Sequence, residues 1–491
     1  MSATEPPSGA GSGFGRPPSE HGALERPWRG RRLHFVGVGG AGMSAYARAA
    51  YALGAEVSGS DRAASPYAER LAADGILRAR IGHRAGNVPA GAGVELVYSS
   101  AVAADNVERV AARERGIAEH PRAQLLAELT GMRRTIAVAG THGKTTTASM
   151  LAHALRAAGL QPGWLVGAPI GGGLANAEWG AGEWLVVEAD ESDRSMLSLN
   201  VEVAVLTNVE LDHHATFSSL AELRETFREF LVRARRAAVV WDRPELLELT
   251  RRPGRAQPER PLPQHRPPLG SEPPPGIEVV PYDVPDVVLV PGGSRFRWRG
   301  HDVALAVPGA HNALDAAAAL EVVRLTGADE HVALAALADF PGAGRRFQAL
   351  GMTGSGARVY EDYAHHPTEI AATLAGARTL APRRLVAVFQ PHLYSRTQLL
   401  AREFGVALAH ADVTVVLDVY PARERAADHP GVSGLLVAQA TADAARGAPV
   451  YWLPSFADAE PVLRGLLRDG DVCVVMGAGD VDELARELVR S

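Results

Sequence analysis

The chain of 491 residues is poor in cysteine, and Cys473 is its single thiol. One cysteine cannot build an intramolecular disulfide framework or a cysteine-rich zinc site, and it fits a reducing cytoplasm. A strong charge of one sign is also missing, because 50 Lys and Arg residues against 56 Asp and Glu residues leave a net charge of −6. This balance argues against nucleic-acid wrapping and against a polybasic membrane surface. We therefore expect a cytoplasmic protein with small-molecule partners, and its oligomeric state, monomer or dimer, stays open.

Long hydrophobic segments are lacking as well. The longest uncharged run, 157–177, is long enough to span a membrane, but it contains Pro162, Pro169 and six glycines, so a membrane helix is not expected. Residues 1–30 contain Gly, Pro, Ser and charged residues without the apolar segment of a signal peptide. We interpret them as a disordered tail.

Lysine is almost absent. Of the 50 basic residues 49 are arginine, and Lys144 is the only lysine in the chain. Lysine carries a compact point charge, whereas arginine carries a planar fork. The one position that keeps a lysine is therefore expected to need an ammonium group.

What is present is ordinary globular composition, with 46% hydrophobic and 22% charged residues. The length corresponds to about three domains. After the tail, the alternation of apolar runs and helical stretches divides the chain into three α/β units at 31–132, 133–339 and 340–491. The second unit contains an insertion at 251–276 with nine prolines and many arginines, which we interpret as a surface segment without assigned function.

The apolar runs of strand length alternate with helical stretches in every unit, which predicts parallel sheets of nucleotide-binding type. The expected strands are 33–38, 56–60 and 94–98, then 135–139, 184–188, 203–207 and 237–240, and finally 359–362, 385–389, 413–417 and 472–476.

A phosphate-binding loop is the strongest motif. A β-branched strand at 135–139 runs into Gly-Thr-His-Gly-Lys-Thr-Thr and then into a helix of small residues. Glycines let backbone N–H groups approach phosphate oxygens, the lysine reaches the β and γ oxygens, and the threonine after it can hold Mg²⁺. The loop is a shortened Walker form, because Val138 stands where the longer pattern has a glycine. The predicted ATP-binding residues are Gly140, Thr141, His142, Gly143, Lys144, Thr145 and Thr146.

Two acidic and histidine clusters follow strands of the same unit. The sequence EADESD covers 188–193, and Glu210-Leu-Asp-His-His ends at 214. Ligands of parallel sheets gather at the carboxyl ends of strands, so these clusters are expected to complete a Mg²⁺ site. The predicted metal ligands are Thr145, Glu188 and His213, with the choice between His213 and His214 left open. The alternative is a set of solvated loop charges.

A second glycine pattern lies in the first unit. Gly37-Val-Gly-Gly-Ala-Gly42 follows the first strand and opens a helix, and Asp61 comes 19 residues after Gly42. This spacing is typical of loops that bind a diphosphate on a helix N-terminus. It does not say which nucleotide binds, and a tight strand–helix junction is the alternative interpretation.

The third unit carries polar residues after two of its strands. They are the sequence Tyr-Glu-Asp-Tyr-Ala-His-His-Pro-Thr at 360–368 and Gln-Pro-His-Leu-Tyr-Ser-Arg at 390–396. His392 and Arg396 are four residues apart and would share one face of a helix. The arginine fork suits a carboxylate. Packing or a surface turn is the alternative for the histidines.

These motifs occur together with PGAHN at 308–312, RRFQ at 345–348, DVYPARE at 418–424 and GAGD at 477–480. In this combination and order the chain resembles the Mur ligases over about residues 31–491. The resemblance implies a Rossmann-like N-terminal domain, a P-loop central ATPase domain and a Rossmann-like C-terminal domain. It also implies that the first unit binds the UDP of a sugar nucleotide, the second MgATP, and the third an amino acid.

The resemblance assigns further residues to these ligands. The UDP-sugar would contact Gly37, Gly39, Gly40, Ala41, Gly42, Met43, Asp61, Ser99 and Ser100. ATP would also contact Asn312, Arg346 and Asp362, and the amino acid would contact Tyr363, His365, His392 and Arg396. Lys144, Glu188, His213 and His365 are the expected catalytic residues.

The activity that the resemblance implies is ATP-dependent joining of L-alanine to the lactyl carboxylate of UDP-N-acetylmuramate through an acyl phosphate, in peptidoglycan precursor synthesis. His365 or a nearby carboxylate would accept the proton of the amine. One alternative acceptor is a recycled tripeptide. An alternative of another class is an NAD-dependent oxidoreductase that uses the first glycine loop.

Overall fold

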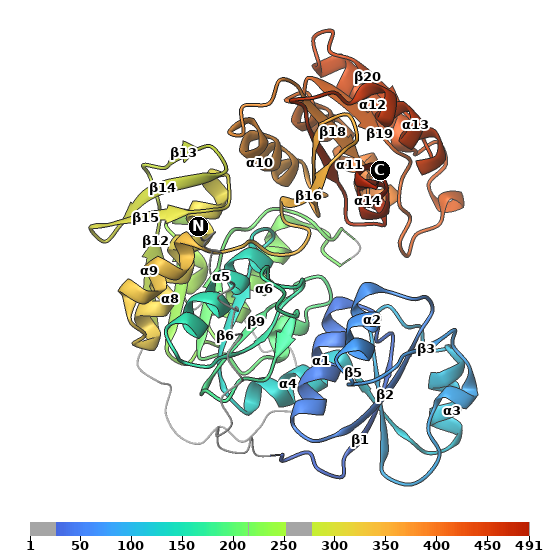
Figure 1. The fold of residues 1–491 in the computed structure, drawn as a ribbon. Helices are drawn as coiled ribbons and strands as arrows, with labels where there is room; N and C mark the ends of the chain where they lie inside the picture. Colours follow the sequence, from blue (N-terminus) through green and yellow to red (C-terminus); the bar gives the residue numbers. More distant parts are fainter. Residues whose placement is uncertain (1–25, 215, 252–276, 491) are drawn as a thin grey trace, which may run out of the picture.

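The computed structural model describes residues 26–214, 216–251 and 277–490, and it forms three successive α/β units (Figure 1). The expected tail at 1–30 lies outside the described residues except for its last five, and the insertion at 251–276 lies outside them except for Arg251. The turn at 27–30 places Trp28 against the core of the first unit, so the end of that segment belongs to the fold.

The first unit is a five-stranded parallel sheet in the order β3-β2-β1-β4-β5. This order, with helices between the strands, is that of a Rossmann-like layer. Its strands are β1 Arg32–Val36, β2 Glu56–Asp61, β3 Arg80–Ile81, β4 Val94–Tyr98 and β5 Ala118–Pro121, and its helices are α1 Ala41–Ala52, α2 Pro66–Ala73, α3 Val107–Glu114 and α4 Arg122–Gly131.

The second unit is a seven-stranded sheet in the order β12-β11-β10-β6-β9-β7-β8. All of its neighbours are parallel except β7 and β8. The strands are β6 Arg134–Ala139, β7 Gly163–Leu165, β8 Ala177–Glu178, β9 Trp184–Glu188, β10 Val203–Leu206, β11 Ala237–Trp241 and β12 Glu278–Tyr282, and the helices are α5 Lys144–Ala157, α6 Leu220–Leu231 and α7 Pro244–Leu247.

A small antiparallel sheet extends the second unit after β12. It consists of β13 Val288–Val290, β14 Gly293–Trp298 and β15 His301–Leu305, and it leads into α8 Ala310–Thr326 and α9 Glu330–Ala338. The small residues of α8 pack against α5, because runs of alanine let two helices approach closely.

The third unit is a six-stranded sheet in the order β16-β17-β21-β18-β19-β20, parallel except for its edge strand β16. Its strands are β16 Gln348–Met352, β17 Arg358–Asp362, β18 Leu385–Phe389, β19 Val413–Val416, β20 Val450–Trp452 and β21 Val472–Met476, and its helices are α10 Pro367–Arg378, α11 Tyr394–Leu408, α12 Gly434–Ala444, α13 Phe456–Leu466 and α14 Val481–Val489.

The predicted α/β architecture with three nucleotide-type layers is therefore confirmed. Buried strands such as β6, β10, β18 and β21 read as continuous apolar runs because helices cover both faces of a parallel sheet. Among the residues that the structure describes, none of the helices combines the length and the apolar character needed to cross a bilayer.

Candidate active site

The phosphate-binding loop joins β6 to α5 as the sequence predicts. Gly140 and Gly143 have positive φ angles of 135° and 80°, which glycine adopts without strain. A Cβ atom at Gly140 would lie 2.0 Å from Oγ1 of Thr207, so the loop packs against the end of β10. The N-terminus of α5 therefore opens toward the carboxyl end of the sheet, with its first N–H groups available to an anion.

Lys144 starts α5 and turns its amine back into the loop. Its Nζ donates to the carbonyls of Gly140 and Thr141 at 2.6 and 3.1 Å and to Oε1 of Glu191 at 2.9 Å. Burial lowers the pKa of Lys144, but the charges of Glu191 and Glu188 outweigh it, so the pKa is raised and the amine is cationic at neutral pH.

The predicted metal ligands come together only in part. The hydroxyl of Thr145 donates to both carboxylate oxygens of Glu188 at 3.0 Å. His213 instead faces Glu191, with 3.3 Å between its Nε2 and Oε1. Among the described residues, Oε2 of Glu191 is buried without a hydrogen-bond partner. A hydroxyl, carboxylate oxygens and an unpaired buried carboxylate oxygen are the donors that Mg²⁺ prefers, so the local chemistry fits this ion.

The glycine loop of the first unit joins β1 to α1. The N–H of Gly39 donates to Oδ2 of Asp61 at 2.8 Å, so Asp61 braces the loop from the end of β2. Ser99 follows β4 beside Gly37, and Ser100 is exposed next to it. Gly40, Ala41 and Gly42 form the loop and first turn of α1, and Met43 is buried beneath them.

The central and C-terminal units meet over the phosphate loop. Nη2 of Arg346 lies 3.4 Å from the hydroxyl of Thr145, and its guanidinium lies over the ring of Tyr363. Asp362 ends β17, and burial raises its pKa to about 6. Asn312 is buried in the first turn of α8, where its amide donates to the carbonyl of Pro308 at 2.7 Å.

The predicted amino-acid-binding residues gather around one buried ion pair. Arg396 donates to both carboxylate oxygens of Asp212 at 2.7 and 3.0 Å, and both side chains are 3% exposed. Its Nη1 also lies 3.0 Å from Nδ1 of His392. His365 stands close to Asp212 at 3.9 Å, with Tyr363 beside its ring. In this structure the carboxylate on the Arg396 fork thus comes from the central unit.

The two histidines near this pair are neutral at neutral pH. Burial lowers the pKa of His365 to about 4. Burial, the His365 imidazole once acid has protonated it, and the charge of Arg396 lower the pKa of His392 to about 3. Burial would raise the pKa of Asp212, but the charge of Arg396 outweighs it and holds the pKa below its ordinary value.

Several residues of the site escaped the sequence analysis. Arg122 begins α4 and donates to Asp190 and Asp193 at 2.8 and 2.7 Å, which ties the first unit to the EADESD cluster. Asn176 donates to the carbonyl of Ala41 at 2.7 Å. Neither residue belongs to a motif. Glu369 directly follows the 360–368 sequence and was not singled out either, although its position at the start of α10 places its carboxylate in the site.

His142 of the phosphate loop is held by two carboxylates. Its Nε2 lies 3.3 Å from Glu210, and its Nδ1 lies 3.3 Å from Glu369 of α10. Burial lowers the pKa of His142, but the two negative charges outweigh it and raise the pKa to about 9.

Three family domains match the chain in order. Residues 32–134 match "Mur ligase family, catalytic domain", residues 138–257 match "Mur ligase middle domain", and residues 345–479 match "Mur ligase, glutamate ligase domain". A UDP-N-acetylmuramate–L-alanine ligase of Rubrobacter xylanophilus is 42% identical over 93% of this chain and 99% of its own length. The chain belongs to the Mur ligase family.

Further relatives match nearly the whole length of the chain. A UDP-N-acetylmuramate–L-alanine ligase of Streptomyces griseus is 41% identical over 95% of this Mur ligase chain and 97% of its own. The solved UDP-N-acetylmuramate–alanine ligase of Thermotoga maritima has a TM-score of 0.76 and 25% identity over 93% of this chain and 98% of that one. A murein peptide ligase of Psychrobacter arcticus, with a TM-score of 0.68 and 23% identity over 94% and 98% of the two chains, shares the fold.

Proposed function

We propose that this Mur ligase joins L-alanine to the lactyl carboxylate of UDP-N-acetylmuramate and cleaves ATP to ADP and phosphate. The relatives that are named for this activity are 41–42% identical to the chain, and the match covers nearly their whole length. The observation that carries the proposal is the meeting of the phosphate loop with Arg346 and the Arg396 cluster of the third unit. This arrangement would bring a triphosphate and a small carboxylate-bearing molecule to one junction.

The first step would move the γ-phosphoryl group of ATP to the lactyl carboxylate, which turns a poor electrophile into an acyl phosphate. Catalysis of this step is mostly positioning and charge stabilisation. Lys144 and Arg346 would both neutralise the phosphate oxygens at the N-terminus of α5. Thr145 and Glu188 would hold Mg²⁺, with His213 as a third proposed ligand, and the ion when bound supplies further positive charge for the phosphates.

The sugar nucleotide would lie on the first unit. The N-terminal turn of α1 with Gly40, Ala41 and Gly42 would face its diphosphate, because a helix N-terminus favours anions. Gly37, Gly39, Asp61, Ser99 and Ser100 would shape the loops around it. Met43 is buried in the core, so it would support the loop from beneath and would not touch the nucleotide.

The second step would be attack of the neutral amine of L-alanine on the acyl phosphate, followed by loss of phosphate from the tetrahedral intermediate. Arg396 would take the alanine carboxylate in exchange for Asp212, with Tyr363 and His392 beside it. His365 is neutral and can accept the amine proton, but a pKa of about 4 makes it a weak base, whereas the pKa of Asp362, about 6, is nearer neutrality. Both stay candidates. Because an acyl phosphate hydrolyses when wet, the third unit would cover the phosphate loop during this step.

The decisive assay measures phosphate release from ATP with each substrate present or omitted. The proposal requires release that depends on both UDP-N-acetylmuramate and L-alanine. Release that ignores either one would contradict it. Replacing L-alanine by glycine, serine or the tripeptide in the same assay determines the acceptor.

The two alternatives are a tripeptide acceptor and an NAD-dependent oxidoreductase. A murein peptide ligase shares the fold, so the fold does not separate alanine from the tripeptide, and the relatives at 41–42% identity favour alanine. An NAD-dependent oxidoreductase leaves the phosphate loop without a role, and membership of the Mur ligase family argues against it. Cytoplasmic location remains a prediction.

A further inference from the structure

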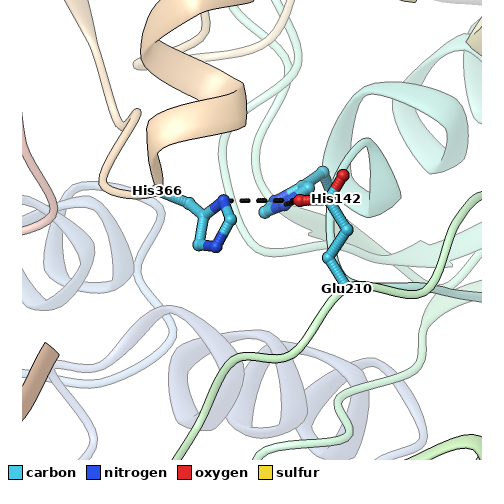
Figure 2. Close-up of side chains that lie close together, drawn as sticks. All are labelled: His142, Glu210 and His366. Atoms are coloured by element: carbon cyan, nitrogen blue, oxygen red, sulfur yellow. Dashed lines mark hydrogen bonds and ion pairs between the residues drawn. The ribbon is translucent and has the colours of Figure 1, made fainter. Parts of the chain in front are cut away.

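Three metal-ligating side chains converge on the rim of the junction between the central and C-terminal units. His142 comes from the phosphate loop, Glu210 from the segment after β10, and His366 from the N-terminus of α10, as Figure 2 shows. Their ligand atoms all lie within 4.8 Å of one another. The proposed reaction assigns no chemistry to His366 or Glu210.

The spacing of these atoms fits a small tetrahedral ion. Oε2 of Glu210 lies 3.3 Å from Nε2 of His142 and 3.5 Å from Nδ1 of His366. Ligand atoms that bind a tetrahedral ion at about 2.1 Å lie about 3.4 Å from one another. Two of the three distances already match this value, and the two imidazole nitrogens, which lie within 4.8 Å of each other, would close on an ion placed between the three groups.

The surroundings favour a dication. Glu369 places a second carboxylate 3.3 Å from the far nitrogen of His142, so two carboxylates face the imidazole. Glu210 is 40% exposed, which leaves a path from solvent. Binding would displace the proton of His142 and release Nδ1 of His366 from its contact with the N–H of Thr368.

We propose that His142, Glu210 and His366 form a binding site for one transition-metal dication of the zinc class, with water as the fourth ligand. The site is separate from the Mg²⁺ that would accompany ATP, because imidazole nitrogens suit zinc, nickel and copper, whereas Mg²⁺ selects oxygen ligands. Two histidines, one carboxylate and a water form a common zinc ligand set.

The ion would connect two units that the reaction needs to separate. His142 and Glu210 belong to the central unit and His366 to the C-terminal unit. A metal bond across this junction would hold the third unit over the phosphate loop and slow product release. Zinc would therefore inhibit turnover without competing for the Mg²⁺ ligands.

Cobalt(II) is a suitable probe, because four-coordinate Co²⁺ absorbs strongly in the visible range. The full chain without ATP is titrated with Co²⁺ in excess Mg²⁺, which occupies the oxygen-rich site. We expect one equivalent of visible-absorbing Co²⁺ that Zn²⁺ displaces. His366→Ala and Glu210→Gln should each lose it, whereas His410→Ala, which removes an exposed imidazole, should keep it.

Two further measurements make the outcome clear. Glu210→Gln leaves the cap of α10 intact, so it tests the ligand role even if His366→Ala destabilises that helix. His366→Cys should keep the ion and add a thiolate-to-metal absorption band. Equal Co²⁺ spectra and stoichiometry for the parent chain, His366→Ala and Glu210→Gln would overturn the proposal and leave the cluster as a metal-free contact between units. Failure of the ligase assay would not affect this result, because no substrate is present.

Discussion

The two junctions of this Mur ligase differ in kind. The first and second units share one continuous apolar cluster, which runs from Leu33 and Leu125 to Leu185 and Phe230. The second and third units have separate apolar clusters, and polar pairs such as Arg396 with Asp212 and Thr368 with Glu210 connect them. An apolar core resists separation because opening it exposes surface to water, whereas polar groups can exchange their partners for water or substrate.

The contrast between an apolar and a polar junction indicates that the third unit can move more easily than the first. We infer that the first two units form one rigid support, which carries the proposed sugar-nucleotide site and the phosphate loop. The third unit is attached through groups that also fit ligands, since the Arg396 fork that binds Asp212 would equally bind a substrate carboxylate. If Arg396 holds the substrate as proposed, substrate binding and closure of the third unit would compete for its side chain.

The largest expected effect is that of Lys144→Ala, which should abolish the reaction and leave binding of the sugar nucleotide to the first unit unchanged. Lys144→Ala should lower ATP-dependent amide formation at least 1000-fold, about 4 kcal/mol, because no other lysine can neutralise the phosphates. Binding of the UDP-sugar, measured by calorimetry, should remain. Turnover within about tenfold of the parent chain would show that the lysine does not serve the phosphates.

A matched pair of core variants tests the continuity of the apolar junction. Leu125 in α4 and Leu374 in α10 are both fully buried leucines, and each change to alanine should cost about 2–5 kcal/mol of stability. Leu125→Ala should increase amide hydrogen exchange in the first and second units together, and Leu374→Ala only in the third. If Leu125→Ala affected the first unit alone, the shared core would not couple the two.

Acid should weaken the rigid support through Glu108. Burial would raise the pKa of this carboxyl, but hydrogen bonds from His34, Asn87, Ser60 and His83 outweigh it and lower the pKa to about 2. A lowered folded-state pKa gives stability that is present above the unfolded value of 4.5 and is lost as the pH falls toward 2. The contribution is at most about 3 kcal/mol.

The check is the free energy of unfolding of the parent chain and of Glu108→Gln at several pH values. The difference between the two should shrink as the pH falls from 4.5 toward 2. A difference that is constant over this range would mean that Glu108 titrates alike in the folded and unfolded chains.

The smallest expected effect concerns the exchange of partners at the polar junction. Arg396→Ala should raise the KM for L-alanine about ten- to a hundredfold, which corresponds to loss of a charge-assisted hydrogen bond. The KM for ATP should change less. Steady-state kinetics with each substrate varied gives both values, and an unchanged KM for L-alanine would remove Arg396 from the carboxylate site.

Strands in buried positions were predictable because their apolar runs are continuous. The bounds of β4, β18 and β21 agree with the sequence analysis to the residue. The sheet of β13, β14 and β15 was not predicted. Its first strand exposes Val288 and Leu289, so it lacks the apolar run of a buried strand.

The candidate site was predictable where the residues that form it are adjacent in the sequence. The phosphate loop needs only a strand, two glycines and a helix, all adjacent in the chain. The partner of Arg396 was not predictable, because Asp212 lies 184 residues away and reaches it only through the packing of two units. The same holds for Arg122, whose contacts with Asp190 and Asp193 cross the first junction.

The scarcity of lysine gives the phosphate loop a built-in reporter. An endoprotease that cleaves only after lysine has a single target bond in this chain, on the carboxyl side of residue 144 in the first turn of α5. Cleavage there requires local unfolding of that turn. The rate at which two fragments accumulate would therefore measure how often this part of the enzyme opens, and bound nucleotide should slow it.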